Sequence, residues 1–177
     1  SSVMNASGLG TKETVAEIQE ELKKAGISFY ASIFGSYLKD KFHREWMSDY
    51  PELRCVRRGT PGSLMCLKRF RDGTYYEDFF AEKLVQTLVD YEMEGVHLAD
   101  SFCPSSVLYL SDYSTDMVEQ FSEHLDIALP RVLSDTMGDD GTSAVNIRAD
   151  YLWENMREQW IRFYQWRWEG FFRKICD

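Results

Sequence analysis

The sequence has no long apolar run, and this excludes the simplest kind of membrane-spanning helix. No stretch of the 177 residues approaches the eighteen or so consecutive apolar residues that a bilayer-spanning helix needs. Residues 1–10 are small and polar, without the basic and apolar blocks of a secretory signal, and are typical of a loop. We therefore expect no membrane partner.

Basic residues are too few for a protein that binds nucleic acid. Lys and Arg total 20 against 29 Asp and Glu, so the formal net charge is −9 at pH 7. Binding to a phosphate backbone requires clustered positive charge, so we expect no nucleic-acid partner. One basic cluster falls in a predicted loop and is either a solvated or ion-paired surface or a clamp for an anion or substrate. It comprises Arg54, Arg57, Arg58, Lys68, Arg69 and Arg71.

Cysteine and histidine are scarce, and their spacing matches no metal site. The four cysteines form no C-x-x-C pair, and no histidine stands at zinc-ligand spacing from them. Cys55 and Cys66 share a loop and could form a disulfide, although free thiols are the expected state. The sequence has no glycine-rich phosphate loop or Ser-His-Asp elbow, and Asp139 and Asp140 lack the spacing of a calcium loop. We therefore expect no metal and no cofactor.

What the sequence does contain is a unit of helix, glycine and strand that occurs twice. The first unit spans residues 14–34 around Gly26, and the second spans residues 75–99 around Gly95. In each, apolar residues at helical spacing give way to a short apolar run, and the glycine between them can close the helix in the left-handed conformation. Two consecutive units of this kind predict parallel strands joined by helical crossovers.

Two further helices are predicted after the second strand. The first covers residues 115–128 and begins at a cap near Ser114 or Asp116. The second covers residues 149–176 and carries Trp153, Trp160 and other aromatic residues on one stripe, which favours core packing over a sugar platform. Residues 134–142, between the two helices, are typical of a polar loop.

The number of strands decides the fold prediction. Only two segments have a clear strand pattern, and two parallel strands alone do not make a stable sheet. A complete (β/α)8 barrel takes about 200 to 250 residues. The chain is therefore expected to hide weak strands in its loops or, as we favour, to be part of a larger barrel. We predict an α/β fold of parallel (β/α) units, a partial or complete TIM-type barrel, in a single domain over residues 1–177.

Asp100 is the central candidate for chemistry. It stands where the second predicted strand ends, and the ligand crevice of a parallel α/β sheet lies at the carboxyl ends of its strands. The segment 35–73, which follows the first strand, is far longer than the usual connection and carries His43 and Trp46. Long loops at strand ends are usually lids or ligand-binding loops.

Three segments resemble a known family: AGISFYAS at residues 25–32, HREW and YPE within residues 43–52, and YEMEGVHLAD at residues 91–100. They are similar to inner strands of glycoside hydrolase TIM barrels, in the β-galactosidase-like and fucosidase-like groups. The resemblance extends loosely over residues 12–176. It implies a carbohydrate substrate and hydrolysis of O-glycosyl bonds, with Asp100 at the sugar-binding end.

Glycoside hydrolysis needs two carboxyl groups, of which Asp100 can supply one. The role of Asp100 stays open among a nucleophile, a residue that only holds sugar hydroxyls, and a side chain that caps the next turn. The sequence offers no clear strand to carry the second carboxylate. The alternative function is therefore a non-catalytic carbohydrate-binding or structural barrel segment. That segment would be completed by further segments of the barrel or by a homo-oligomer.

The remaining candidates are predicted substrate contacts. His97 alternates with Val96 and Leu98, which are expected to face helices, so it is either a sugar contact or a packed core histidine. His43 and Trp46 either contact a sugar or pack against a neighbouring helix. The full set of predicted substrate contacts is His97, His43, Trp46, Tyr30 and Arg69.

Overall fold

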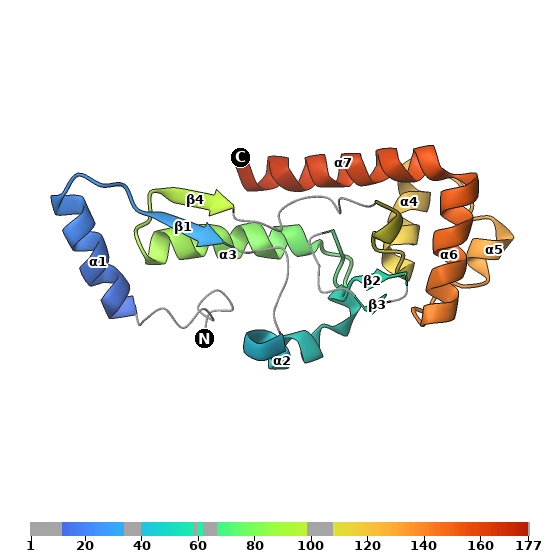
Figure 1. Ribbon diagram of the computed structural model, residues 1–177, viewed down its shortest axis with the longest axis horizontal. Helices are drawn as coiled ribbons and strands as arrows, with labels where there is room; N and C mark the ends of the chain where they lie inside the picture. The colour runs from blue at the N-terminus through green and yellow to red at the C-terminus, as the bar shows by residue number, and fades with distance from the viewer. Residues whose placement is uncertain (1–11, 34–39, 59, 62–66, 99–107, 177) are drawn as a thin grey trace.

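A computed structural model describes residues 12–33, 40–58, 60–61, 67–98 and 108–176. The α-helices of this part are α1 (Lys12–Lys24), α2 (Asp40–Asp49), α3 (Tyr76–Asp90), α4 (Thr115–Leu125), α5 (Arg131–Ser134), α6 (Thr142–Asn155) and α7 (Arg157–Cys176). Two single turns of 3₁₀-helix are η2 (Pro51–Leu53) and η3 (Leu108–Leu110). The strands are β1 (Tyr30–Ile33), β2 (Val56–Arg57), β3 (Thr60–Pro61) and β4 (Gly95–Leu98). Figure 1 shows an elongated arrangement, with α1 at one end and α4, α5 and α6 gathered at the other.

The two predicted strands pair in parallel, as expected. In the β1–β4 sheet Tyr30 stands opposite Gly95, and Ser32 stands opposite His97. The chain passes from β1 to β4 through α3, so the predicted helical crossover is confirmed for this pair. Figure 1 shows both strands beside the C-terminal part of α3.

The predicted (β/α) barrel is wrong. In the described ranges the parallel sheet has only two strands, and the other sheet is the short antiparallel pair of β2 and β3. From residue 108 onward the described chain forms helices and no further strand. The physical reason is that the later segments carry apolar residues at helical spacing, such as Met117, Phe121 and Leu125 in α4. Such stripes are buried by packing helix on helix, without a sheet.

The main hydrophobic core lies where α7 contacts α3, α4 and α6. Trp160 of α7 is fully buried there, and its ring stacks on Tyr113 with centroids 5.2 Å apart and meets the edge of Phe121 at 5.1 Å. Its indole Nε1 donates a hydrogen bond of 3.3 Å to Ser111 Oγ. The predicted core role of Trp160 is therefore confirmed. No helix in the described part is long and apolar enough to span a bilayer.

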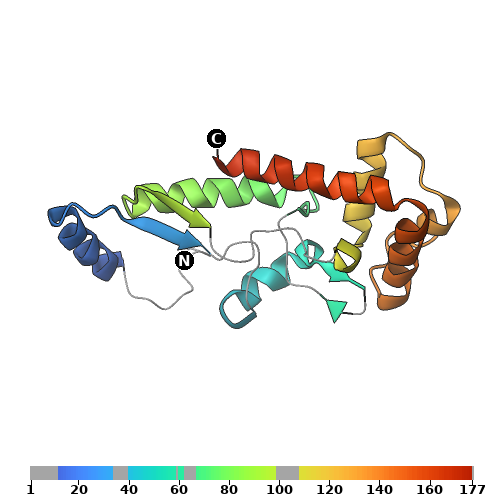
Figure 2. The ribbon, with the colours of Figure 1, turned by 45° about the horizontal axis from the view of Figure 1, so that its top comes forward.

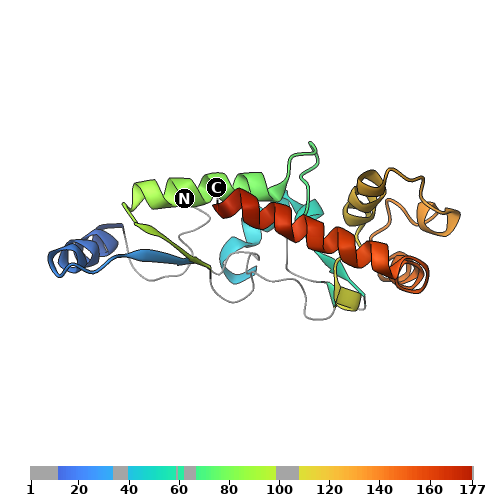
Figure 3. The same cartoon turned by 90° about the horizontal axis from the view of Figure 1, so that it is seen from above.

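Helices α3 and α7 are joined by both aromatic and charged contacts. Phe80 and Phe171 stack with ring centroids 6.1 Å apart. Beside them the buried Arg167 donates to Glu77 Oε2 at 2.8 Å and to the Leu67 carbonyl oxygen at 3.3 Å. Figures 2 and 3 show α7 running alongside α3 from two further directions. Helix α7 therefore connects the region of β1 and β4 to the helical end of the molecule.

Two helix boundaries differ from the sequence prediction. The predicted helix over residues 149–176 is broken at Met156, where φ is −135° and ψ is 27°, so that α6 and α7 are separate helices. The predicted loop over residues 134–142 is only partly loop, because α5 ends within it and α6 begins at its last residue. The start of α4 is as predicted, with Ser114 as its N-cap residue.

The two glycines of the repeated unit behave differently. Gly26 follows α1 with a φ of 68° and closes the helix in the left-handed conformation, as predicted. Gly95 does not close α3. The helix ends at Asp90, Glu92 takes the left-handed conformation with a φ of 46°, and Gly95 is the first residue of β4. Backbone conformation therefore does not account for the glycine at position 95.

Candidate functional site

The β1–β4 sheet has one covered face and one open face. On the covered face Ala31 is buried and Val96 packs against the main core. Strand alternation puts Tyr30, Ser32 and His97 on the opposite face, and all three side chains are exposed. We call this surface the open face. It brings together two of the predicted substrate contacts, Tyr30 and His97.

The exposure of His97 excludes one of its two predicted roles. A packed core histidine would be buried, whereas His97 is exposed and stands directly across the sheet from Ser32. The core alternative is therefore wrong. Its role as a sugar contact remains a prediction. Val96 packs against the main core, so the expectation that His97 and Val96 lie on opposite faces of the strand is confirmed.

The Tyr30 ring lies across the neighbouring strand at Gly95. A Cβ atom built on Gly95 would stand 2.6 Å from Tyr30 Cε1 and 2.8 Å from Tyr30 Cδ1, so the ring occupies the space of the missing side chain. The Tyr30 residue is nevertheless 54% exposed. The open face thus presents an accessible aromatic ring beside the Ser32 hydroxyl and the His97 imidazole. An apolar ring with a few adjacent hydrogen-bonding groups is the usual make-up of a small-molecule site.

Helix α1 holds the turn that leads into β4. Gln19 donates through Nε2 to the Glu92 carbonyl oxygen at 2.5 Å, and Lys23 pairs with the Glu92 carboxylate at 3.0 Å. The same turn is tied to the residue before β1, because Phe29 N donates to Glu94 Oε2 at 3.2 Å and Glu94 N donates to the Phe29 carbonyl at 3.0 Å. These contacts fix where both strands of the open face begin.

Trp46 packs against protein rather than standing free. It lies in α2, half-buried, with its ring 4.7 Å from that of Tyr50 and stacked on Phe79 of α3 at 5.5 Å. Phe70 completes the cluster by meeting the edge of Tyr50 at 5.3 Å. These contacts support the packing alternative for Trp46. The backbone of His43 also belongs to α2, but its side chain lies outside the described part of the chain.

Arg69 is engaged by the acids of α4. Its Nε donates to Asp116 Oδ1 at 2.7 Å, its backbone N–H donates to Asp116 Oδ2 at 2.9 Å, and Nη1 donates to Glu123 Oε2 at 2.9 Å. Burial lowers the pKa of Arg69, but the two carboxylates more than offset it, so the pKa lies above its ordinary value. Arg69 therefore attaches its loop to α4. This favours the ion-paired alternative for the basic cluster, in which Arg58 also pairs with Asp150 at 2.7 Å.

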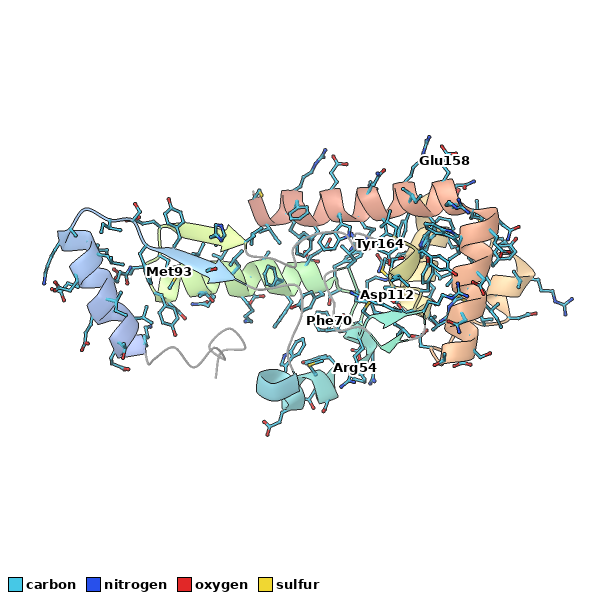
Figure 4. All side chains as sticks on the ribbon, viewed as in Figure 1. Arg54, Phe70, Met93, Asp112, Glu158 and Tyr164 are labelled. Carbon is cyan, nitrogen blue, oxygen red and sulfur yellow. The ribbon has the colours of Figure 1, made fainter. Side chains whose placement is uncertain are left out.

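A buried polar cluster precedes α4 and was not predicted. Lys68 Nζ donates to Ser114 Oγ at 2.5 Å and lies 3.9 Å from Asp112 Oδ2. Tyr164 of α7 donates to the Asp112 carbonyl oxygen at 2.6 Å, and Figure 4 shows these two residues between α7 and the β2–β3 pair. A lysine beside a serine is an arrangement found in nucleophilic catalysis. Here Ser114 is 0% and Lys68 is 2% exposed, so no substrate reaches them and their role is structural.

The described surface away from the open face carries one further groove. An open groove lies at the junction of α6 and α7, along Trp153, Glu158 and Arg162. Three of its charged residues are engaged, because Arg162 pairs with Glu158 at 2.6 Å and Arg157 lies over the Trp153 ring at 4.9 Å. Within the ranges that the structure covers, no group of three or more His, Cys, Asp or Glu side chains is arranged to hold a metal ion.

Asp100 and two of the four cysteines lie outside the described residues. Asp100, the predicted catalytic residue, follows Leu98, the last residue of β4, by two positions. Cys66 and Cys103 are also outside, so the possible bridge between Cys55 and Cys66 is not tested. Cys55 is buried and Cys176 is exposed, and both carry free thiols.

Comparisons of the chain with protein-family models, with curated proteins and with solved structures find no significant match. The resemblance to glycoside hydrolase barrels therefore stays a prediction from the three quoted motifs.

Proposed function

We propose that this protein acts on carbohydrate and that a neutral sugar binds to the open face of β1 and β4. The observation that carries the proposal is the parallel register of the two strands. It puts an exposed aromatic ring, a hydroxyl and an imidazole, from Tyr30, Ser32 and His97, on one side of the sheet.

These three side chains have complementary chemistry for a sugar. The exposed face of the Tyr30 ring suits the apolar face of a pyranose, where C–H groups can pack against the aromatic ring. The Ser32 hydroxyl both donates and accepts hydrogen bonds, and the imidazole of His97 offers two ring nitrogens that can hydrogen-bond. Neither strand contains a lysine or arginine, so the described residues of β1 and β4 offer no ammonium or guanidinium group to a phosphate or a carboxylate. A neutral sugar therefore fits better than an anionic one.

We propose hydrolysis of an O-glycosyl bond as the reaction, with Asp100 as one of its two carboxyl groups. Parallel strands end at the same edge of a sheet, and Asp100 follows β4 closely in the sequence. Glycosidases need a second carboxyl group, on the other side of the scissile bond. The four-residue strands β1 and β4 contain no acid themselves. That observation favours the second candidate, a protein that binds carbohydrate without cleaving it.

Binding is tested by titrating a panel of neutral mono- and oligosaccharides into the full chain, followed by ligand-observed NMR. Replacing Tyr30 or His97 by alanine should weaken binding at least about tenfold, which corresponds to losing about 1.4 kcal/mol. His124→Ala and Trp166→Ala serve as matched controls, because these exposed rings stack on each other at 4.1 Å between α4 and α7. The controls should bind as the wild type does. Equal binding by Tyr30→Ala and the wild type would refute the site.

Hydrolysis is tested with a panel of aryl glycosides and the Asp100→Asn variant. If Asp100 acts in the reaction, the variant should lose hydrolysis while still binding sugar at the open face. Binding without hydrolysis in the wild type would support the non-catalytic alternative. Hydrolysis that is unchanged in Asp100→Asn would remove Asp100 from the mechanism.

A further inference from the structure

We propose that Gly95 is a positioning residue of this site. Because it has no side chain, the Tyr30 ring can lie across β4 and turn its outer face to the ligand. The ligand in this inference depends on the proposed function, whereas the position of the ring does not. The inference therefore adds a fourth residue to the site, one that acts through Tyr30.

Gly95 is required by space and not by backbone conformation. The described glycines with positive φ are Gly26, Gly73 and Gly138, and Gly95 is not among them. A glycine inside a strand weakens it, because the backbone loses more entropy on folding and no side chain packs. Something must offset that loss at Gly95. The structure shows one feature that can do so. Two atoms of the Tyr30 ring lie within 3.0 Å of the position that a Cβ atom on Gly95 would take.

A ring across a glycine can also serve sheet stability alone, since an aromatic residue opposite a glycine compensates for the missing side chain. Tyr30 stays 54% exposed although one side of its ring lies against Gly95. The exposed side is therefore available to a ligand, and the binding measurements below separate the binding role from the purely stabilising one.

The position of the ring also sets the class of ligand. The Ser32 and His97 pair lies two residues along the strands from the Tyr30 and Gly95 pair, a distance of about 7 Å at 3.3 Å per residue. A pyranose that stacks on Tyr30 thus reaches Ser32 and His97 with hydroxyl groups at its rim. We infer a neutral pyranoside bound by its apolar face. Any side chain at position 95 would push the ring away from this arrangement.

The test is a double-mutant cycle on sugar binding with Gly95→Ala, Tyr30→Ala and the double variant, using the tightest neutral sugar of the panel. Gly95→Ala should weaken binding about five- to tenfold in the wild-type background and less than twofold when Tyr30 is already alanine. Gly170→Ala is the matched control. Gly170 is a helical glycine whose added Cβ would meet only one atom, at 3.9 Å, and binding should not change.

The position of the Tyr30 ring is measured separately from sugar binding. In the wild type, NMR should show a nuclear Overhauser effect between the Tyr30 ring protons and the Gly95 Hα protons, and this contact should be lost in Gly95→Ala. Circular dichroism checks folding. Tyr30→Phe keeps the ring and should retain the contact and most of the binding, even if Gly95→Ala does not fold.

The outcomes separate the two proposals. If the ring contact is present but no sugar binds the wild type, the proposed function fails, and with it the ligand role of Gly95. If sugar binding depends on Tyr30 and His97 but Gly95→Ala weakens it equally in both backgrounds or not at all, only the positioning role fails. Absence of the Tyr30 to Gly95 contact also overturns the positioning role, whether or not sugar binds.

Discussion

Replacing the buried Arg148 with methionine should strongly destabilise the protein. The side chain of Arg148 is 0% exposed, and its guanidinium donates four hydrogen bonds of 2.6 to 2.9 Å. Three go to the carbonyl oxygens of Tyr113, Thr136 and Asp139, and the fourth goes to Asp140 Oδ1. One side chain of α6 thus holds the segment before α4 and the loop before α6 together.

The expected loss of stability depends on whether each hydrogen-bond partner of Arg148 can find another partner once the guanidinium is gone. The Tyr113 residue is buried, so its carbonyl oxygen would lose its partner without reaching water, which costs about 1–3 kcal/mol. Asp140 is 40% exposed at its side chain and keeps hydrogen bonds from Thr115, so it loses little. Hydrogen bonds from a charged group contribute about 1.5–3 kcal/mol each, so the two to the Tyr113 and Thr136 carbonyl oxygens account for about 3–6 kcal/mol. We expect Arg148→Met to fall in that range.

The measurement is urea unfolding followed by tryptophan fluorescence and circular dichroism. The control is Arg162→Met. Arg162 and its partner Glu158 are 74% and 75% exposed one turn apart on α7, and such pairs contribute about 0.3–0.5 kcal/mol. Arg148→Lys should lie between the two, because it keeps the charge but cannot reach four acceptors. If Arg148→Met lowers the free energy of unfolding no more than Arg162→Met does, with the same m value, the reasoning from buried hydrogen bonds is refuted.

Two further predictions concern titratable side chains. Burial, with a smaller contribution from Asp112, raises the pKa of the Cys55 thiol, so Cys55 should resist Ellman's reagent in the native protein while the exposed Cys176 reacts. The experiment uses a Cys66→Ser, Cys103→Ser background, and native labelling of Cys55 as fast as that of Cys176 would contradict it. Burial raises the pKa of Tyr113 to about 12 from 10.0, so its stabilising effect is complete below pH 10 and is lost as the pH rises from 10 to 12. Urea midpoints should therefore fall less over this range in Tyr113→Phe than in the wild type, and equal falls would contradict the assignment.

Local sequence patterns predicted the elements that depend on neighbouring residues. The β1 and β4 segments, the left-handed Gly26 and the cap at Ser114 follow from residue type and spacing over a few positions. Pairing of the two strands was also foreseen. The barrel was not a local inference, because it assumed that a unit seen twice continues around a closed sheet. The later helices instead bury their stripes against one another.

For the charges and rings named at the site, the sequence did not show the partners that lie far along the chain. Arg69 was a candidate substrate contact, but its partners lie 47 and 54 residues away in α4. Trp46 stacks on Phe79 of another helix. Arg148, Arg167 and Lys68 were not recognised as buried, since a charged residue in a sequence is read as exposed unless its partner is known. By contrast, the open face follows from strand alternation, which the sequence displays directly.

Helix α7 packs against both α3 and α4, and this affects how the molecule unfolds locally. Its 20 residues extend over about 30 Å, with Trp160 in the core near α4 and Phe171 against α3. Because one helix serves both regions, neither can lose its packing without disturbing the other, and amide exchange in α3, α4 and α7 should be slow and concerted. Helix α1, in which Gln19 is the only buried residue, lies outside this unit. Its amides should exchange earlier, by local fraying that leaves the rest of the protein folded.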